Sequence, residues 1–273
     1  MRVLLATAAD EHFAPLLRDL IESLPQRAFA DLAIFDLGLS RETLHWANAR
    51  ARHIVAPGWD LPVSERVRIA QPYHRALTVR PFLRDYFPGY QAYVWLDADC
   101  WIQEARALDH YFASVRRGAL VIAPQSHPAY RHGERSRRWR ADRLGAYFGT
   151  DAACPPKRAP YVNAGVFALL AKAPHWQAWR DSFKQGLAAT DGELVCDQTA
   201  LNHALWTQRL PLVPLPARFN WLCHLALPAY DPKRRCLCEP TTPNRSLGIV
   251  HLAAGTKDIL ALRYSSLHKA RNG

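Results

Sequence analysis

Strand-like and helix-like segments alternate along the first hundred residues, and this alternation limits the possible folds more than any other feature of the sequence. Residues 2–8 form an apolar, strand-like run, and residues 10–24 follow with apolar side chains at helical spacing behind Asp10, a residue type common at helix caps. Further strand and helix patterns occur in turn at 31–38, 40–50, 52–57, 80–87 and 91–97. The sequence therefore predicts an α/β protein with a doubly wound, mostly parallel central sheet.

The second half of the chain is more mixed. Strand patterns cover 118–124, 161–171 and 247–253, helix patterns cover 174–187 and 197–208, and prolines are concentrated between 211 and 243. The prolines predict loops that wrap the sheet. Because no internal repeat, low-complexity tract or linker divides the chain, we expect one domain over residues 1–273.

The composition indicates a soluble globular protein. Hydrophobic residues make up 49% of the chain and charged residues 22%, which is enough for a substantial core. No apolar run approaches the roughly 18 residues of a membrane span, and the N-terminus turns acidic before it could form the apolar part of a signal peptide. We therefore expect a cytoplasmic protein.

The six cysteines are scattered and follow no secretory leader, which favours reduced thiols over a disulfide framework. A zinc site built from Cys223, His224, Cys236 and Cys238 is an alternative. Their spacing matches no common zinc motif, so we expect buried or surface thiols.

The formal net charge is +11, and much of the positive charge lies in the segment 131–143, where six arginines surround Trp139. Such a segment is either a solvated face or a contact for something anionic: a phosphate-bearing acceptor, an acidic membrane surface or nucleic acid. Nucleic acid ranks last, because no zinc-finger spacing and no RNP-like aromatic strand accompanies the charge. We expect no nucleic-acid partner.

A buried strand at 93–96 ends abruptly in two carboxylates, Asp97 and Asp99. Residues two apart in an extended segment project to the same side, and ligands of open α/β sheets bind beyond the carboxyl ends of the strands. Two close carboxylates repel each other unless they share a cation or a proton, and Mg²⁺ or Mn²⁺ suits such oxygen ligands. The alternative is a turn in which Asp99 caps the backbone and Asp97 pairs with an arginine.

The last strand pattern ends in His251, and Lys257 follows six residues later. An imidazole added to two carboxylates favours Mn²⁺ over Mg²⁺, and a nearby lysine could hold a phosphate. Taken alone, a histidine such as His251 is more often a hydrogen-bonded core residue than a metal ligand.

Six short motifs in a fixed order connect this chain with a known family. They are AAD at 8–10, LDAD at 96–99, VNAGVFALL at 162–170, DQTALN at 197–202, RFNW at 218–221 and HLAAGTK at 251–257. In these motifs the chain resembles the family 8 glycosyltransferases over residues 3–257. Those are retaining, metal-dependent enzymes of the GT-A fold that use nucleotide sugars, and they include bacterial lipopolysaccharide galactosyl- and glucosyltransferases and glycogenin.

The resemblance implies a role for each matching residue. Asp10, with the backbone of Ala8 and Ala9, would face the base of the nucleotide, usually uracil, and Lys257 would reach the diphosphate. Asp97, Asp99 and His251 would bind the metal, with Asp97 also near the ribose. Asn163, Ala164 and Gly165 would line the sugar pocket, and Asp197 and Gln198 would lie at the hydroxyls and the reacting carbon of the sugar. The implied cofactors are Mn²⁺ or Mg²⁺ and a UDP-hexose, and the implied acceptor is a glycan, a glycolipid or another molecule of bacterial polysaccharide or lipopolysaccharide synthesis.

The chain also departs from the family pattern. The family has glycine three residues after the histidine and Pro-Trp after the lysine, whereas here Gly255 lies four residues after His251, and Asp258 and Ile259 follow Lys257. The family's arginine before the D-x-D strand has three candidates, Arg75, Arg80 and Arg84, of which we favour Arg80.

By the resemblance, residues up to about 105 form the nucleotide-binding half, and about 106–260 form the acceptor and sugar half. A short basic tail at 261–273 could touch the anionic inner face of a membrane. For the site that binds the acceptor, we suggest only the segment 125–143.

Several functions stay open at this stage. Retention by double displacement would use Asp197 or the Gln198 carbonyl as the nucleophile, whereas the alternative is attack by the acceptor from the same face as the leaving group. Asp197 could also be a helix N-cap. A nucleotidyltransferase would need a glycine-rich loop after the first strand, which is absent. A glycoside hydrolase using Asp97 and Asp197, or a non-catalytic sugar- or nucleotide-binding module, remains the alternative to a transferase.

Overall fold

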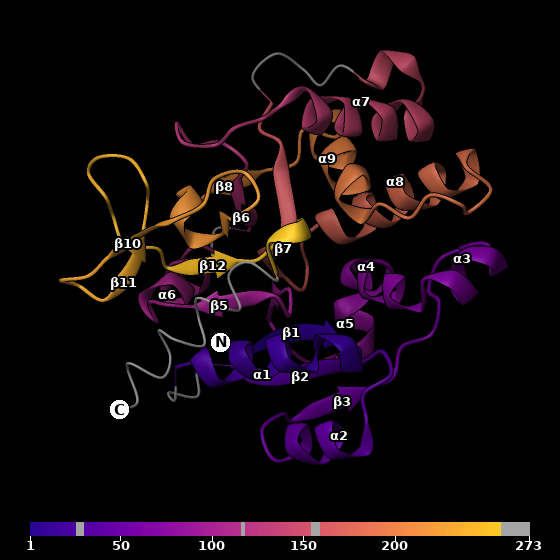
Figure 1. Ribbon diagram of the computed structural model, residues 1–273. Coiled ribbons are helices and arrows are strands. Elements are labelled where there is room, and N and C mark those ends of the chain that lie inside the picture. Colours follow the sequence, from indigo (N-terminus) through magenta and orange to yellow (C-terminus); the bar gives the residue numbers. More distant parts are fainter. Residues whose placement is uncertain (26–29, 116–117, 154–158, 258–273) are drawn as a thin grey trace.

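A seven-stranded sheet runs through the molecule in the computed structural model, which describes residues 1–25, 30–115, 118–153 and 159–257 (Figure 1). The strand order is β3-β2-β1-β4-β7-β6-β8. All neighbouring strands are parallel except β7, which is antiparallel to both β4 and β6. The strands are β1 (Val3–Ala9), β2 (Asp31–Asp36), β3 (His53–Val55), β4 (Ala92–Leu96), β6 (Leu120–Pro124), β7 (Val162–Leu170) and β8 (Leu212–Pro214). The predicted fold class, a mostly parallel α/β sheet, is confirmed.

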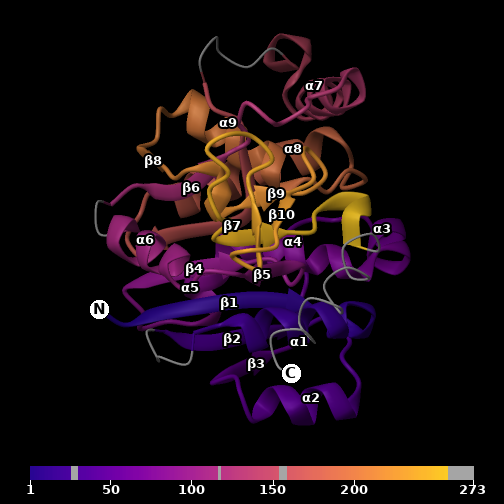
Figure 2. The same cartoon turned by 60° about the vertical axis from the view of Figure 1, so that its left-hand side comes forward.

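Helices cover both faces of this sheet. Their bounds are α1 (Ala14–Ser23), α2 (Arg41–Asn48), α3 (Glu65–Ala70), α4 (Arg75–Val79), α5 (Leu83–Tyr86), α6 (Arg106–Val115), α7 (Glu134–Phe148), α8 (His175–Ala189) and α9 (Asp197–Thr207). Figure 2 shows β1, β2 and β3 one below another, with α2 at that edge of the molecule.

The alternation of side chains along β4 divides the core between the two faces. Tyr93 and Trp95 pack on one side with the apolar residues of α5, α8 and α9, whereas Val94 and Leu96 pack on the other side with α6. All four side chains are buried. Because β4 is apolar on both faces, its carboxyl end is the first place where polar side chains can follow, and Asp97 lies there.

A second, three-stranded sheet lies beyond that end of β4. Its order is β5-β12-β9, with β5 at Cys100–Ile102, β12 at Ile249–His251 and β9 at Trp221–Leu222. The register pairs His251 with Cys100, so the end of β12 lies beside the Asp97–Asp99 turn. A short hairpin of β10 (Ala229–Asp231) and β11 (Cys236–Cys238) completes the described strands.

The segment predicted as one helix at 80–87 is instead broken. A 3₁₀ turn at Arg80–Phe82 separates α4 from α5, because Pro81 has no N–H with which to continue an α-helix. The break directs the Arg80 side chain inward, and only 6% of this residue is exposed. The basic segment at 131–143 belongs largely to α7.

Among the described residues, no helix combines the length and the apolar character that crossing a bilayer requires. The basic tail at 261–273 and the departures at Asp258 and Ile259 lie outside the described residues.

We predict that Gly186→Ala destabilises the protein. A Cβ at position 186 in α8 would overlap the Tyr147 ring. That ring cannot move easily, because its hydroxyl donates to the Leu194 carbonyl and accepts from the Cys196 N–H. Alanine gains about 1 kcal/mol in helix propensity, but overpacking costs about 1–3 kcal/mol, so we expect a net loss of up to about 2 kcal/mol in the free energy of unfolding.

Urea unfolding followed by tryptophan fluorescence measures this loss. Gly58→Ala is the control, since no heavy atom lies within 4 Å of a Cβ at that position. A Gly186→Ala protein as stable as wild type would contradict the packing described here.

Candidate active site

Asp97 directly follows β4, and its two oxygens face different partners. Oδ1 accepts hydrogen bonds from Arg80 Nη2 and, at 2.7 Å, from Trp95 Nε1. Oδ2 lies 3.7 Å from His251 Nε2. Burial raises the pKa of Asp97, and the Arg80 charge opposes this shift.

Asp99 lies on the same turn, held by the backbone bond from Leu252 N–H to its carbonyl at 2.9 Å. Its Oδ1 is 3.2 Å from His251 Nε2, and its Oδ2 is 2.9 Å from Lys257 Nζ. Burial alone would raise the pKa of Asp99, but His251 and Lys257 outweigh it and hold this pKa below its usual value. The structure therefore brings together all three predicted metal ligands and the predicted phosphate-binding lysine.

The tautomer of His251 follows from its neighbours. Asn163 Oδ1 accepts from the Gly165 N–H at 3.0 Å and from Asn220 Nδ2 at 3.1 Å. The amide of Asn220 must then present its Oδ1 to His251 Nδ1 at 2.8 Å, so Nδ1 carries the proton. Nε2 consequently faces the carboxylates, where it can donate to Asp99 as an imidazolium or, once deprotonated, bind a metal ion through its lone pair.

Asp97 Oδ2 and Asp99 Oδ1 therefore both lie near His251 Nε2, at 3.7 and 3.2 Å. Such an arrangement is stable only with a cation or a proton between the acceptors, and two carboxylates with one imidazole suit a divalent ion. The Cys100 thiol also lies near Asp99 and His251, with ligand atoms within 4.8 Å of one another. Burial raises the pKa of this thiol, which keeps it neutral and makes it the weaker ligand.

The absence of a side chain at Gly165 is essential to this arrangement. A Cβ there would collide with the His251 ring and the Asp97 carboxylate. The Gly165 carbonyl also accepts from the Asp97 N–H at 2.8 Å. The predicted sugar-pocket residue Gly165 is thus packed directly against His251 and Asp97.

A buried ion bridge joins β4 to α9. Arg80 donates to Asp97 and, through Nη1 at 2.6 Å, to Asp197 Oδ2. Burial would lower the pKa of Arg80, but Asp197 and Asp97 outweigh it and raise this pKa. Asp197 is the first residue of α9, whose N-cap is Cys196, so the N-cap alternative for Asp197 is wrong.

A cavity of about 220 Å³ opens beside the carboxylates. Every residue predicted to contact the nucleotide lines it, together with Asp99: Ala8, Ala9, Asp10, Arg80, Asp97 and Lys257. Asp10 uses one oxygen, Oδ1, to accept from the Phe13 N–H at 3.0 Å. The binding roles of these residues stay predictions.

The predicted sugar-binding residues lie beside this cavity and do not line it. Gln198 Oε1 accepts from Asn163 Nδ2 at 2.9 Å and from the Ala164 N–H at 3.3 Å. Asp197 reaches the cavity only through Arg80. Of the three arginine candidates, Arg80 lines the cavity, whereas Arg84 donates to the Ala171 carbonyl and Arg75 to the Leu37 and Pro57 carbonyls.

Sequence reasoning missed several residues of the site. Asn220, within the RFNW motif, was assigned no role although it orients His251. The cavity walls also include Phe13, Tyr73, His74 and Leu77, which come from segments without a motif. Only their spatial proximity could have identified them.

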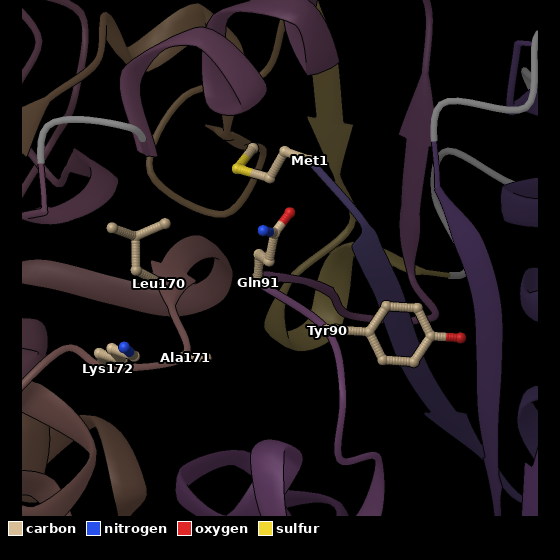
Figure 3. A pocket seen from close by; sticks show the side chains of 6 residues that line it. All are labelled: Met1, Tyr90, Gln91, Leu170, Ala171 and Lys172. Carbon is tan, nitrogen blue, oxygen red and sulfur yellow. The ribbon is translucent and has the colours of Figure 1, made fainter.

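A larger hollow of about 650 Å³ lies at the opposite end of the sheet (Figure 3). It is lined by Met1, Tyr90, Gln91, Leu170, Ala171 and Lys172. No residue predicted to bind or react is among them, and its walls contain no carboxylate. The hollow at the carboxyl end of β4 is therefore the candidate active site.

Comparisons with known proteins bear on the fold of the chain. No family model and no curated protein sequence matches the chain. Among solved structures, the galactosyltransferase LgtC, in complex with donor and acceptor sugar analogs, is similar over 98% of this chain and 95% of its own, at 17% identity and a TM-score of 0.59. Mouse xyloside xylosyltransferase 1 is similar over 93% of this chain and 98% of its own, at 13% identity and a TM-score of 0.54.

The chain has the GT-A glycosyltransferase fold. The bifunctional glycosyltransferase WbbM agrees, at 12% identity and a TM-score of 0.52 over 80% of this chain and 39% of its own. LgtC fits the resemblance to family 8 that the motifs indicate. At these identities the likeness concerns the fold, and activity must be argued from the site.

We predict that Arg80→Gln strongly destabilises the protein. The substitution leaves Asp97 and Asp197 buried without a cationic partner, and breaking a buried pair in this way costs about 3–5 kcal/mol. The free energy of unfolding in urea measures the loss. Arg66→Gln, which breaks the exposed pair with Glu193, is the control and should change stability little. Equal stability of the two variants would contradict the bridging role of Arg80.

Proposed function

We propose that the protein is a metal-dependent glycosyltransferase that moves a hexose from a nucleotide sugar, UDP-linked by our expectation, to an acceptor with retention. The observation that carries this proposal is that Asp97, Asp99 and Lys257 line one cavity, and that both carboxylates also lie near His251 Nε2. Two carboxylates and an imidazole with a lysine beside them form a site for a divalent cation together with a diphosphate.

The cavity supports a nucleotide as the donor. Leu37, Leu77 and Phe13 provide apolar walls for a base and a ribose, and Asp97, Asp99 and Lys257 supply charge in the same cavity. Asp10 Oδ1 is used by the Phe13 N–H, and no described residue bonds Oδ2. This second oxygen is available for an N–H of the base, which fits the expectation of uracil.

The chemistry requires the bond between the anomeric carbon and the diphosphate oxygen to break. A divalent ion, when bound, stabilises the negative charge that develops on the leaving diphosphate. Lys257 lies 2.9 Å from Asp99 Oδ2 and 5.4 Å from the centre of the Phe13 ring, where its ammonium group can exchange the carboxylate for a phosphate oxygen. Arg80 holds the Asp97 and Asp197 side chains in place through one hydrogen bond to each.

The contacts of the two candidate nucleophiles favour same-face attack. Gln198 Oε1 already accepts two N–H groups, and Asp197 Oδ2 is bound by Arg80. In same-face attack the acceptor oxygen bonds to the anomeric carbon as the diphosphate leaves, and the acceptor proton passes to a diphosphate oxygen. The same Arg80 bridge disfavours a hydrolase, which needs one of the two carboxylates as a proton donor.

The identity of the acceptor is also part of this proposal. We infer a glycan, glycolipid or related acceptor of polysaccharide or lipopolysaccharide synthesis from the resemblance in the motifs. A cytoplasmic enzyme, free or at the inner face of a membrane, fits such an acceptor.

Nucleotide binding tests the donor assignment. We expect UDP to bind with micromolar affinity in the presence of Mn²⁺, and to lose this binding in excess EDTA, because the ion links the carboxylates to the diphosphate. Calorimetric titration of UDP, GDP and ADP measures the affinity and identifies the base. The absence of any metal-dependent binding would reject the proposal.

Two isosteric variants separate binding from transfer. Asp99→Asn should abolish Mn²⁺-dependent UDP binding, whereas Asp197→Asn should bind UDP like wild type but lose transfer and hydrolysis of the nucleotide sugar. Asp142→Asn changes an exposed residue of α7 and is the control. It should leave both UDP binding and transfer unchanged. Normal UDP binding by Asp99→Asn would remove Asp99 from the ligand set, and full activity of Asp197→Asn would remove Asp197 from the mechanism.

A further inference from the structure

Arg140 of α7 is a half-buried arginine that is held only by neutral acceptors. Its Nη2 donates to the Gln125 side-chain oxygen and, at 3.0 Å, to His132 Nδ1. His132 Nε2 donates to the Gln125 carbonyl at 2.9 Å, which leaves Nδ1 as the acceptor and His132 neutral. The guanidinium also lies over the Tyr161 ring, 4.4 Å from its centre.

The charge of Arg140 is not balanced by the protein. Among the described residues, no carboxylate forms an ion pair with Arg140, in contrast to Arg80, which has two. Burial lowers the pKa of Arg140, which reflects the cost of placing an unpaired cation there. Arg137 adds a second positive charge nearby, since its Nη1 donates to the His132 carbonyl at 2.8 Å. A half-buried cation without a counter-ion is stabilised when an anion binds.

This cluster lies next to the reacting centre. Gln125 follows β6 and Tyr161 precedes β7, and the Gln125 N–H donates to the Tyr161 carbonyl at 2.8 Å. Because β7 is antiparallel, its first residues lie at the same edge of the sheet as Asp97. The Tyr161 hydroxyl accepts from Gln198 Nε2 at 3.4 Å. One tyrosine side chain therefore connects the Arg140 guanidinium with Gln198.

We propose that Gln125, His132, Arg140 and Tyr161 form an acceptor subsite that binds an anionic group, a phosphate or a carboxylate, on the sugar that receives the transferred hexose. This inference rests on the proposed function and names its acceptor class. Arg140 Nε and Nη1 have no partner among the described residues, and a guanidinium fork matches both kinds of oxyanion. Tyr161 offers its ring for contact with a sugar as well as with the guanidinium.

The position of Arg140 favours a small acceptor over an extended anionic surface. Arg131, Arg135, Arg137 and Arg138 are exposed and would contact a membrane first. Arg140 is instead half-buried and held by the Gln125 and His132 side chains. Its contacts hold the guanidinium in one orientation, which suits a single anionic group better than an extended anionic surface.

The test is titration of sugars into the protein saturated with UDP and Mg²⁺, so that the donor site is occupied. The probes are glucose 6-phosphate, glucuronate, neutral methyl glucoside and inorganic phosphate. We expect one anionic sugar to bind at least about tenfold more tightly than methyl glucoside, the value of one charge-assisted interaction. The preferred sugar distinguishes a phosphate from a carboxylate.

Variants of two arginines on the same helix provide the matched comparison. Arg140→Gln should lose the preference for the anionic sugar while it binds UDP like wild type. Arg138→Gln, whose arginine only pairs with exposed Asp142, should keep the preference. Arg140→Lys keeps the charge but not the fork, should retain part of the preference, and replaces Arg140→Gln if the latter does not fold.

Three results would overturn the inference. One is equal binding of charged and neutral sugars by the wild type. Another is binding of inorganic phosphate as tight as that of the sugar phosphate. The third combines two observations: the wild type prefers no sugar, and both glutamine variants lose binding to phosphatidylglycerol vesicles equally. That result would indicate that the helix contacts a membrane. If UDP fails to bind, the proposed function fails, and titration of the protein alone still tests the anion subsite.

Discussion

The Arg80 bridge is the interaction on which the rest of the site depends. It joins Asp97 at the end of β4 to Asp197 at the start of α9, and all three side chains are largely or fully buried. Ionised carboxylates in such surroundings require a fixed cation, and the arginine fork supplies one to each. The bridge also explains why the chain tolerates the broken helix at Pro81, since the 3₁₀ turn directs Arg80 inward.

A second series of hydrogen bonds begins at the backbone and leads to His251, one of the predicted metal ligands. The Gly165 N–H fixes Asn163, Asn163 fixes Asn220, and Asn220 sets the tautomer of His251. Each side-chain amide is thereby oriented by a partner whose own direction is already determined. The three predicted metal ligands are consequently preorganised, and no large rearrangement is needed to receive a cation.

Local patterns in the sequence were enough to predict the central sheet and the carboxylates after β4, because an apolar strand that ends in D-x-D carries its own signal. The last strand pattern added His251 as a candidate, and the motif resemblance added Gly165. Other features depend on distant contacts that no local pattern encodes. The register of β12 against β5 places His251 beside Asp99. Asn220 bonds to Asn163 and His251, which are both remote from it in sequence. Arg140 meets Tyr161 only because β6 and β7 are paired.

The two sides of the site differ in how their charge is balanced. On the donor side Arg80 and Lys257 are each matched by carboxylates, so the positive and negative groups there form a nearly closed set. Beside Tyr161, Arg140 has only an amide, an imidazole and an aromatic ring. A ligand that adds negative charge gains more where the protein has left a cation uncompensated. The imbalance thus lies where an acceptor would approach, and its sign indicates the charge that this acceptor carries.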